Sequence, residues 1–404
     1  MRGHARRTGA AFGYDAGMDE LSAWLLTLTL TEPGEFTAAV AGRLIAAGVP
    51  VWRFTVSFST MHPETGVVSI LWTAEDGVVT RNNSHTRQQT PFFLDSPMAV
   101  ISRGAPGLRR RLTGPEAQLD FPICRELAAQ GATDYAVFAL QFTHGRRFGM
   151  TVTTRHPDGF ADAALAMIRA AVPALTRSLE LVQSYYATRM LLQVYLGANA
   201  ARRVIEGQFV RGSGTHLHAA IWTCDLRGFT SLSDRRPPRE VTEMLDAYFE
   251  RVTVPVHRHG GEVLKFIGDA VLAIFPMASP GHDDGARACA RALTAAREVV
   301  VDMAAWNRGR VEPLLLGIAL HVGEVFYGNV GGPDRLDFTV IGAAVNEACR
   351  LEPLCKLGPA IVMSAAFRGE VDDADIIDLG EQVLRGVAAP VRAFGIRAPS
   401  IDAS

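Results

Sequence analysis

The stretch from Gly260 to Phe275 constrains the fold of this chain more than any other. Its outer parts read as two β-strands, and Gly268-Asp269 between them is a two-residue turn of the kind that closes tight hairpins. Such a turn places Asp269 at the rim of a sheet. Lys265 lies in the otherwise apolar first strand, where a buried ammonium group needs a partner or a ligand. The stretch predicts a hairpin that carries either a ligand site or simply an acidic turn and a solvated lysine.

Length and composition indicate a globular protein with more than one domain. The 404 residues suggest two or three domains, and the shares of 48% hydrophobic and 20% charged residues are ordinary for globular chains. A net charge of -2 argues against bulk nucleic-acid binding. The five cysteines lack metal-type spacing and indicate free thiols in a reducing compartment, so we expect a cytoplasmic protein. No apolar run reaches the roughly 18 to 20 residues that span a bilayer. Residues 1–18 are expected to form a disordered arm.

Helical and β-rich patterns alternate in the N-terminal half. A long helix is expected from about Asp162 to Val194, because apolar residues recur three and four positions apart. Pro173 lies inside this pattern and predicts a kink or a break. The polar segment from Ala74 to Arg111 is expected to be mostly loop. The other expected elements are the helices Asp19–Thr31, Glu35–Ala47 and Ile123–Gln130, the strands Val51–Thr60 and Gly66–Trp72, and a hairpin of Tyr135–Phe142 with Phe148–Thr154.

This order of helices, mixed strands and a long exit helix resembles a GAF-type sensor module. The resemblance rests on element order, and no ligand signature accompanies it. We take residues 19–160 as a GAF-like sensor domain of the α/β class and residues 161–216 as a helical linker or transducer. The sensor domain would respond to an unknown small-molecule ligand or signal, or would serve only for dimerisation.

The C-terminal half has a β-α-β-β-α-β order. An apolar strand over 217–224 ends at Asp225, a helix opens at Pro238, and the hairpin described above follows. We expect a second helix over 283–306 and a strand over 314–321, with 324–330 as the hairpin partner of that strand. A helix over 346–354 and strands over 360–363 and 376–379 complete the pattern. The order predicts a ferredoxin-like core with additions, of the α+β class.

Two aspartates follow strongly apolar strands in this half. Asp225 comes directly after one strand, and Asp269 lies at the tip of the hairpin. If the strands are neighbours, both carboxylates meet at one rim, where they repel each other unless a cation is present. Mg²⁺ is held in proteins by one or two carboxylates together with substrate phosphates. The turn after Asp225 contains Gly228, and its backbone N–H groups suit a di- or triphosphate. The alternative is two unrelated acidic turn residues.

A third group of residues lies on an expected helix. Asn346 and Arg350 are four positions apart and therefore share one helix face. An amide beside a guanidinium suits a developing phosphoryl charge. Taken alone, the pair is explained as well by a surface arginine near a capping asparagine.

Together the three groups resemble the catalytic domain of class III nucleotidyl cyclases. The resemblance rests on Asp225-Leu-Arg-Gly-Phe-Thr, on Lys265-Phe-Ile-Gly-Asp269, and on Thr339-Val-Ile-Gly followed by Asn346 and Arg350. It would cover residues 217–397. It implies that two Mg²⁺ or Mn²⁺ ions per active site bind at Asp225, Asp269 and the Leu226 carbonyl. The substrate would be bound by Gly228, Phe229 and Thr230 at its phosphates and by Lys265 and Thr339 at its purine. Asn346 would orient the ribose, and Arg350 would stabilise the transition state.

The resemblance also implies a homodimer with shared sites, in which the Asp225–Asp269 pair of one chain faces the other four side chains of its partner. Lys265 can donate to adenine N1 and Thr339 can accept from the 6-amino group, so ATP is favoured over GTP. Thr339 resembles the subgroup that includes bicarbonate-responsive enzymes. Ala343 departs from the family, which often has Asp or Asn there, and reduced activity is one expectation. The alternatives are a guanylyl cyclase and a catalytically silent nucleotide-binding or dimerisation module.

Overall fold

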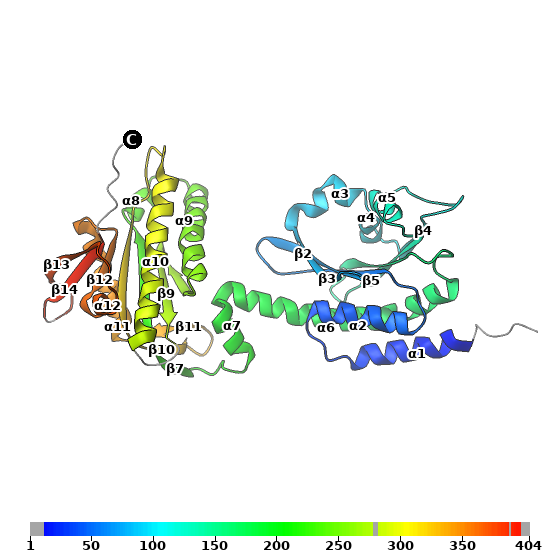
Figure 1. The fold of residues 1–404 in the computed structure, drawn as a ribbon, viewed down its shortest axis with the longest axis horizontal. Coiled ribbons are helices and arrows are strands. Elements are labelled where there is room, and N and C mark those ends of the chain that lie inside the picture. The colour runs from blue at the N-terminus through cyan, green and yellow to red at the C-terminus, as the bar shows by residue number, and fades with distance from the viewer. Residues whose placement is uncertain (1–11, 278–281, 388, 397–404) are drawn as a thin grey trace, which may run out of the picture. The chain divides into compact units, whose positions relative to one another are not determined.

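The computed structural model describes residues 12–277, 282–387 and 389–396, and the chain divides into two compact units, Met1–Leu191 and Leu192–Ser404 (Figure 1). The first helix, α1, spans Phe12–Thr27. It therefore begins inside the segment predicted to be a disordered arm, of which residues 1–11 lie outside the described residues. No helix in the described ranges is long and apolar enough to cross a membrane.

The N-terminal unit is built on a six-stranded antiparallel sheet with the spatial order β3-β2-β1-β6-β5-β4. Figure 1 shows α1, α2 and α6 on one face of the sheet and α3, α4 and α5 on the other. The strands are β1 Arg53–Ser59, β2 Thr65–Thr73, β3 Gly77–Ser84, β4 Gly107–Arg111, β5 Asp134–Gln141 and β6 Arg147–Thr154, and the further helices are α2 Pro33–Ala46, α3 Pro91–Leu94, α4 Pro97–Ser102, α5 Pro122–Ala129 and α6 Asp162–Leu196, with a 3-10 turn at His85–Gln89.

Successive side chains of β1 point to opposite faces of this sheet. Phe54, Val56 and Phe58 are fully buried in the core that α1, α2 and α6 cover, whereas Arg53 and Thr55 point to the other face. This is the period-two alternation of a strand with two different environments. A smaller core on the second face packs under α4 and α5.

One prediction for this unit was wrong, and of the kink or break expected at Pro173 the break does not occur. The segment from Ala74 to Arg111 was expected to be loop, but it contains β3, β4, α3 and α4. Its polar side chains belong to an edge strand and to short helices, where burial imposes no apolar pattern. Pro173 does not break α6, which runs as one helix of 35 residues. Buried side chains on both sides of the proline, including Ile168 and Leu175, fix the two halves of the helix in the same core.

The C-terminal unit has the predicted β-α-β-β-α-β order, formed by β7 Gly214–Leu226, α9 Pro238–Arg258, β8 Glu262–Ile267, β9 Ala270–Pro276, α10 His282–Asn307 and β10 Leu316–Gly331. The sheet has the spatial order β13-β14-β12-β10-β7-β9-β8, with β11 paired to β10. Helices α9 and α10 cover one face and α7 and α11 the other. The remaining elements are α7 Ala198–Ile205, α8 Phe229–Ser233, β11 Leu336–Ile341, α11 Ala343–Leu351, a 3-10 turn Glu352–Leu357, β12 Ile361–Ser364, α12 Ala365–Glu370, β13 Ile376–Gln382 and β14 Val391–Ile396.

The expected hairpin over 314–330 was wrong. Residues 316–331 form one continuous strand, β10, which pairs with β7 from Leu316 opposite Leu226 to Gly328 opposite Gly214. The true hairpin partner of β10 is β11. Gly323, between the two expected strands, lies within the continuous strand and allows a close approach: a Cβ there would lie 2.8 Å from the Ala344 Cβ. The β14 strand was also missed, and α7 was not expected as a separate helix within the helical linker predicted over 161–216.

Candidate active site

The first part of the site is the C-terminal end of β7, the strand at the centre of the sheet. Its apolar residues are buried up to Cys224, whose Sγ is hydrogen-bonded to the hydroxyl of the fully buried Tyr248 at 3.2 Å. Asp225 follows at the edge of this core. Its Oδ1 atom is buried and has no hydrogen-bond partner among the described residues.

The turn between β8 and β9 brings Asp269 to the same place. Gly268 has φ +66°, a left-handed conformation that glycine adopts without strain, and the turn directs Asp269 back toward β7. The backbone N–H of Leu226 donates to Asp269 Oδ2 at 3.2 Å. The two aspartates, 44 positions apart in the sequence, therefore meet at one rim of the sheet.

The electrostatics of this pair favour the binding of a cation. The pKa of Asp225 is raised to about 7, mainly by burial and then by the hydrogen bond to Asp269 and the negative charge of that residue. A carboxylate oxygen that is buried, unpartnered and beside a second carboxylate fits a divalent metal ion. Within the described ranges no cluster of three or more His, Cys, Asp or Glu side chains could hold a metal. The pair would thus need a carbonyl, water or phosphate to complete the coordination.

A third acidic group approaches the pair from a direction that the sequence did not reveal. Glu352 lies against Gly317, where an added Cβ would be 2.6 Å from Glu352 Oε1, and Gly317 is the β10 residue opposite Asp225. Burial raises the pKa of Glu352, and the charges of Arg227 and Lys356 lower it. Gly317 therefore makes room for a carboxyl that adds to the negative potential at Asp225.

The turn after Asp225 is open at the surface. Gly228 has φ +70°, and a Cβ there would meet no atom within 4 Å. Phe229 begins the short helix α8 and packs partly against the core, while Thr230 is exposed. This backbone is free to approach a ligand closely.

Lys265 and Thr339 lie near each other on β8 and β11. A register irregularity between Val263 and Lys265 changes the direction of the lysine side chain, as a β-bulge does. Lys265 Nζ is 3.1 Å from Asp337 Oδ2. Thr339, two residues beyond Asp337 on the same face of β11, is only 4% exposed, and its Oγ1 has no hydrogen-bond partner among the described residues.

Asn346 and Arg350 both lie on α11 with exposed side chains. In the described part of the chain, no hydrogen bond or ion pair joins either of them to Asp225 or Asp269. Within one chain, the two aspartates thus lie together at one rim of the sheet. Lys265 forms a separate ion pair with Asp337, close to Thr339.

Sequence reasoning assigned no role to Asp337 or Glu352. Asp337 could have been found from its spacing, because it alternates with the buried Phe338 and shares a strand face with Thr339. Glu352 gave no comparable signal, since its position depends on the contact with Gly317.

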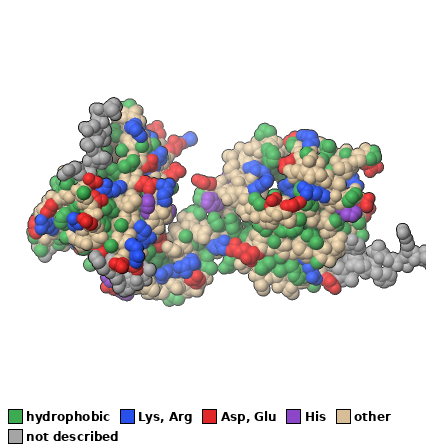
Figure 2. All heavy atoms as spheres, in the orientation of Figure 1, with side chains coloured by type: hydrophobic (Ala, Val, Ile, Leu, Met, Phe, Trp, Pro, Cys, Tyr) green, Lys and Arg blue, Asp and Glu red, His purple; other side chains and the backbone are tan. Residues whose placement is uncertain are grey.

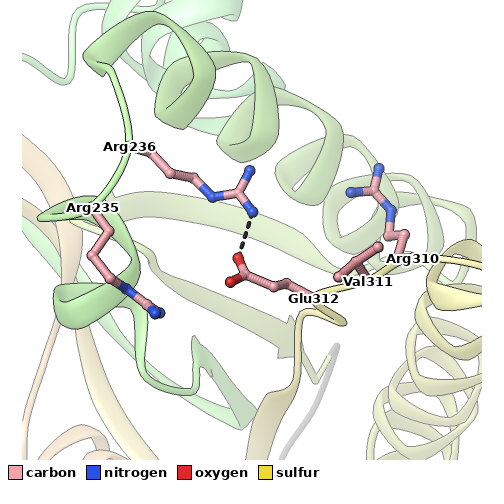
Figure 3. A pocket seen from close by; sticks show the side chains of 5 residues that line it. All are labelled: Arg235, Arg236, Arg310, Val311 and Glu312. Carbon is pink, nitrogen blue, oxygen red and sulfur yellow. Dashed lines mark hydrogen bonds and ion pairs between the residues drawn. The ribbon is translucent and has the colours of Figure 1, made fainter.

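A basic hollow of about 420 Å³ lies beyond α8, lined by Arg235, Arg236, Arg310, Val311 and Glu312 (Figure 3). Arg236 points to Glu312, and its Nη2 donates to Glu312 Oε2 at 2.6 Å. Val311 is 99% exposed, so the hollow is a shallow surface feature. Its ion pair already balances one of its charges, and we assign it no part in the site.

Comparison with known proteins places the site in a family domain. Residues 213–372 match the sequence model of the adenylate and guanylate cyclase catalytic domain. Uncharacterized proteins of Mycobacterium tuberculosis and Mycobacterium bovis are each 38% identical over 185 residues, which is 44% of this chain and 32% of theirs. The chain spans about a third of the length of these curated relatives.

Solved structures with similarity include the adenylyl cyclase CyaB from P. aeruginosa, at 27% identity over 48% of this chain and 100% of that one, with a TM-score of 0.40. The guanylyl cyclase Cya2 is 31% identical over 46% of this chain and 97% of that one, with a TM-score of 0.37. The match to the family model shows that the C-terminal unit contains an adenylate and guanylate cyclase catalytic domain.

Proposed function

We propose that this chain is an adenylyl cyclase, which converts ATP to 3′,5′-cyclic AMP and pyrophosphate. The observation that carries the proposal is the buried Asp225 Oδ1 atom, which has no hydrogen-bond partner among the described residues and lies beside Asp269 inside the region that matches the cyclase domain. A nucleotide triphosphate arriving with divalent cations supplies the positive charge that this pair lacks.

Asp225, Asp269 and the Leu226 carbonyl would hold two Mg²⁺ or Mn²⁺ ions. When bound, the ions would lower the pKa of the ribose 3′-hydroxyl and neutralise the charge on the leaving pyrophosphate. The residues of this chain would orient the triphosphate: the open turn at Gly228, Phe229 and Thr230 offers its backbone to the phosphates.

Lys265 and Thr339 would choose the purine. Adenine offers N1 as an acceptor and the 6-amino group as a donor, which complement a lysine N–H and a threonine oxygen. The ion pair with Asp337 supports this role, because it holds the ammonium group of Lys265 in one place. The orphaned Thr339 Oγ1 supports it too, because a buried hydroxyl without a partner is satisfied when a ligand supplies one.

Asn346 would orient the ribose, and Arg350 would stabilise the charge that develops on the α-phosphate. We propose that they act on the nucleotide held by Asp225 and Asp269 of a second copy of the chain. Their exposure, and the absence of any bond to those aspartates within the described residues, agree with a site shared by two chains. The N-terminal unit would regulate how the two catalytic domains meet.

The direct test is to incubate the purified chain with Mn²⁺ and either ATP or GTP and to measure the cyclic product. Cyclic AMP from ATP is expected. Cyclic GMP alone would favour the alternative guanylyl cyclase and refute the purine argument. No product from either nucleotide, in a correctly folded chain, would favour the silent nucleotide-binding or dimerisation module.

A mixing experiment tests the shared site. Asp225→Ala and Arg350→Ala chains should each be inactive, and mixing them should restore activity, because one of the two sites in a mixed dimer has all its residues. Mixtures that stay inactive although mixed dimers form would refute the two-chain site.

A further inference from the structure

A partly open cavity of about 220 Å³ lies in the N-terminal unit, between one face of the sheet and the helices α3 to α5. Its floor consists of the β1 side chains Arg53, Thr55 and Ser57, which alternate with the buried phenylalanines and valine of the core. In the sequence this polar alternation has the appearance of a solvent-exposed strand face. In the fold it lines an interior space.

The cavity carries excess positive charge. Four arginines line it, Arg53, Arg81, Arg87 and Arg147, with Glu126 as the one acidic side chain. Among the described residues none of the four forms an ion pair with a carboxylate; Arg87 donates to Asn83 Oδ1 and Arg147 to Gln141 Oε1.

Arg53 is the central member of this group. Burial lowers the pKa of Arg53, the charge of Glu126 raises it, and the charge of Arg81 lowers it again. Burial and the charge of Arg81 likewise lower the pKa of Arg87. The fold thus gathers like charges that repel each other, an arrangement that an anion would stabilise.

The rest of the wall combines orphaned polar atoms with apolar surface. Thr55 Oγ1 is buried without a hydrogen-bond partner in the described part of the chain, and Tyr135 is 3% exposed beside Arg53. The apolar side is formed by Val67, Leu71, Phe92, Phe93, Met98, Ile123, Leu127 and Phe148. Drug-sized ligands occupy cavities of about 300 to 1,000 Å³, so this cavity suits a smaller molecule.

An entrance is present. A more open hollow of about 700 Å³ shares Val67, Ser102, Arg147 and Phe148 with the cavity and adds His85, Arg103 and Arg146 at its rim. Figure 2 shows basic side chains around a hollow on this unit. An anion approaching the rim would meet a positive potential that continues inward.

We propose that this cavity binds a small organic carboxylate with an apolar body, the carboxylate at Arg53 and Thr55 and the body against Phe93, Met98 and Phe148. A carboxylate matches the planar donors of an arginine and can also accept from a threonine hydroxyl. This inference concerns the N-terminal unit alone and stands whether or not the chain is a cyclase.

Fluorine NMR on the full chain tests the proposal with para-fluorobenzoate and its neutral analogue para-fluorobenzamide. The acid should bind at least about tenfold more tightly than the amide, because only the acid neutralises Arg53. Inorganic phosphate should displace it poorly at equal concentration, because phosphate leaves the apolar wall uncovered. Equal binding of acid and amide, or equally effective displacement by phosphate, would overturn the proposal.

Three variants locate the binding. Arg53→Met should weaken binding of para-fluorobenzoate about tenfold or more, and Thr55→Val should weaken it several-fold. Arg169→Met is the matched control, since Arg169 is exposed on α6 and lines neither hollow; it should bind like the unmodified chain.

Thermal melting of the ligand-free variants separates binding from folding. Arg53→Met should melt at the same temperature as the unmodified chain or higher, because it removes a half-buried cation that has no carboxylate partner among the described residues. A lower melting temperature would show that Arg53 holds the fold together, and unchanged binding in a folded Arg53→Met chain would show that the anion does not bind there. Either result would refute the proposal.

Discussion

Each unit of this chain has an aspartate with buried carboxylate atoms, and the two aspartates differ in what surrounds them. Asp134 of the N-terminal unit is fully buried, accepts from the Arg109 guanidinium at 2.7 and 3.1 Å, and also accepts from the Phe160 backbone N–H at 3.0 Å. Arg111 lies 3.3 Å away. Asp225 of the C-terminal unit instead has an orphaned oxygen and a second carboxylate beside it.

The arginines of the N-terminal unit show the same contrast. Arg109 is paired with Asp134 and Asp162, whereas Arg53 pairs with no carboxylate in the described residues. A buried charge that its neighbours balance has a structural explanation, and a buried charge that they leave unbalanced needs a ligand. The contrast therefore divides the charged residues into those that stabilise the fold and those that bind a ligand.

The strongest test of this division is Asp225→Asn, which keeps the shape of the side chain and removes its charge. The rate of cyclic AMP formation with Mn²⁺ and ATP should fall about a thousandfold, or about 4 kcal/mol in barrier, because metal binding is lost. The fold should persist, because the asparagine amide can still hydrogen-bond to Asp269 and no cation pairs with Asp225 among the described residues. The exposed Asp234→Asn is the control and should keep full activity; an Asp225→Asn chain with normal turnover would contradict the division.

The opposite result is expected for Asp134→Asn. Removing one partner of a buried ion pair destabilises a protein by about 3 to 5 kcal/mol. Hydrogen exchange should become faster in β5 and β6, which are paired through Asp134 opposite Thr154. Asp158→Asn is the control, because its side chain is exposed and only its backbone carbonyl accepts from Arg111. If hydrogen exchange in β5 and β6 is unchanged in the Asp134→Asn chain, a buried ion pair does not identify a residue that stabilises the fold.

Lys265 and Asp337 form an intermediate case, a pair that is half exposed and lies where a purine would bind. Lys265→Met should lower kcat/KM for ATP about a hundredfold, and Asp337→Asn about tenfold, mainly through KM. The double variant should resemble Lys265→Met, because Asp337 acts through the lysine. Asp334→Asn, exposed in the preceding loop, is the control. Additive losses would show that the two residues act independently.

The smallest effect concerns pH. Because the pKa of Asp225 is raised to about 7, this carboxyl is protonated in the metal-free chain below that pH, and binding of Mn²⁺ must displace the proton. The apparent affinity for Mn²⁺ should therefore fall as the pH drops below 7, by up to about tenfold per unit. Titration calorimetry across this range measures the effect. An affinity that stays flat down to about pH 5 would show that Asp225 is not the group that titrates.

Local patterns predicted much of the C-terminal unit. The apolar strand before Asp225, the Gly268-Asp269 turn and the helix starting at Pro238 are each visible within a few residues, and together they predicted that the two aspartates meet. The residues that were missed depend on distant contacts. Glu352 reaches Asp225 only because Gly317 leaves space, and the β10–β11 hairpin depends on a strand continuing through Gly323.

The N-terminal unit was harder to predict because its two sheet faces are both enclosed. Arg53 and Thr55 alternate with buried residues, and a sequence cannot tell whether such polar positions face water or a cavity under helices α3 to α5. The GAF-like resemblance stays a prediction, as do the domain boundaries drawn from the sequence.

The length of β10 has a further consequence for motion in the C-terminal unit. One strand pairs with Asp225 through Gly317 and with Thr339 through Gly328, so these two residues of one chain, which belong to different sites of the proposed dimer, share an uninterrupted hydrogen-bond ladder. A strand cannot slide by one residue without turning every side chain to the wrong face. We therefore expect a displacement of the aspartates in one site of the dimer to be passed along β10 to Thr339 in the other site.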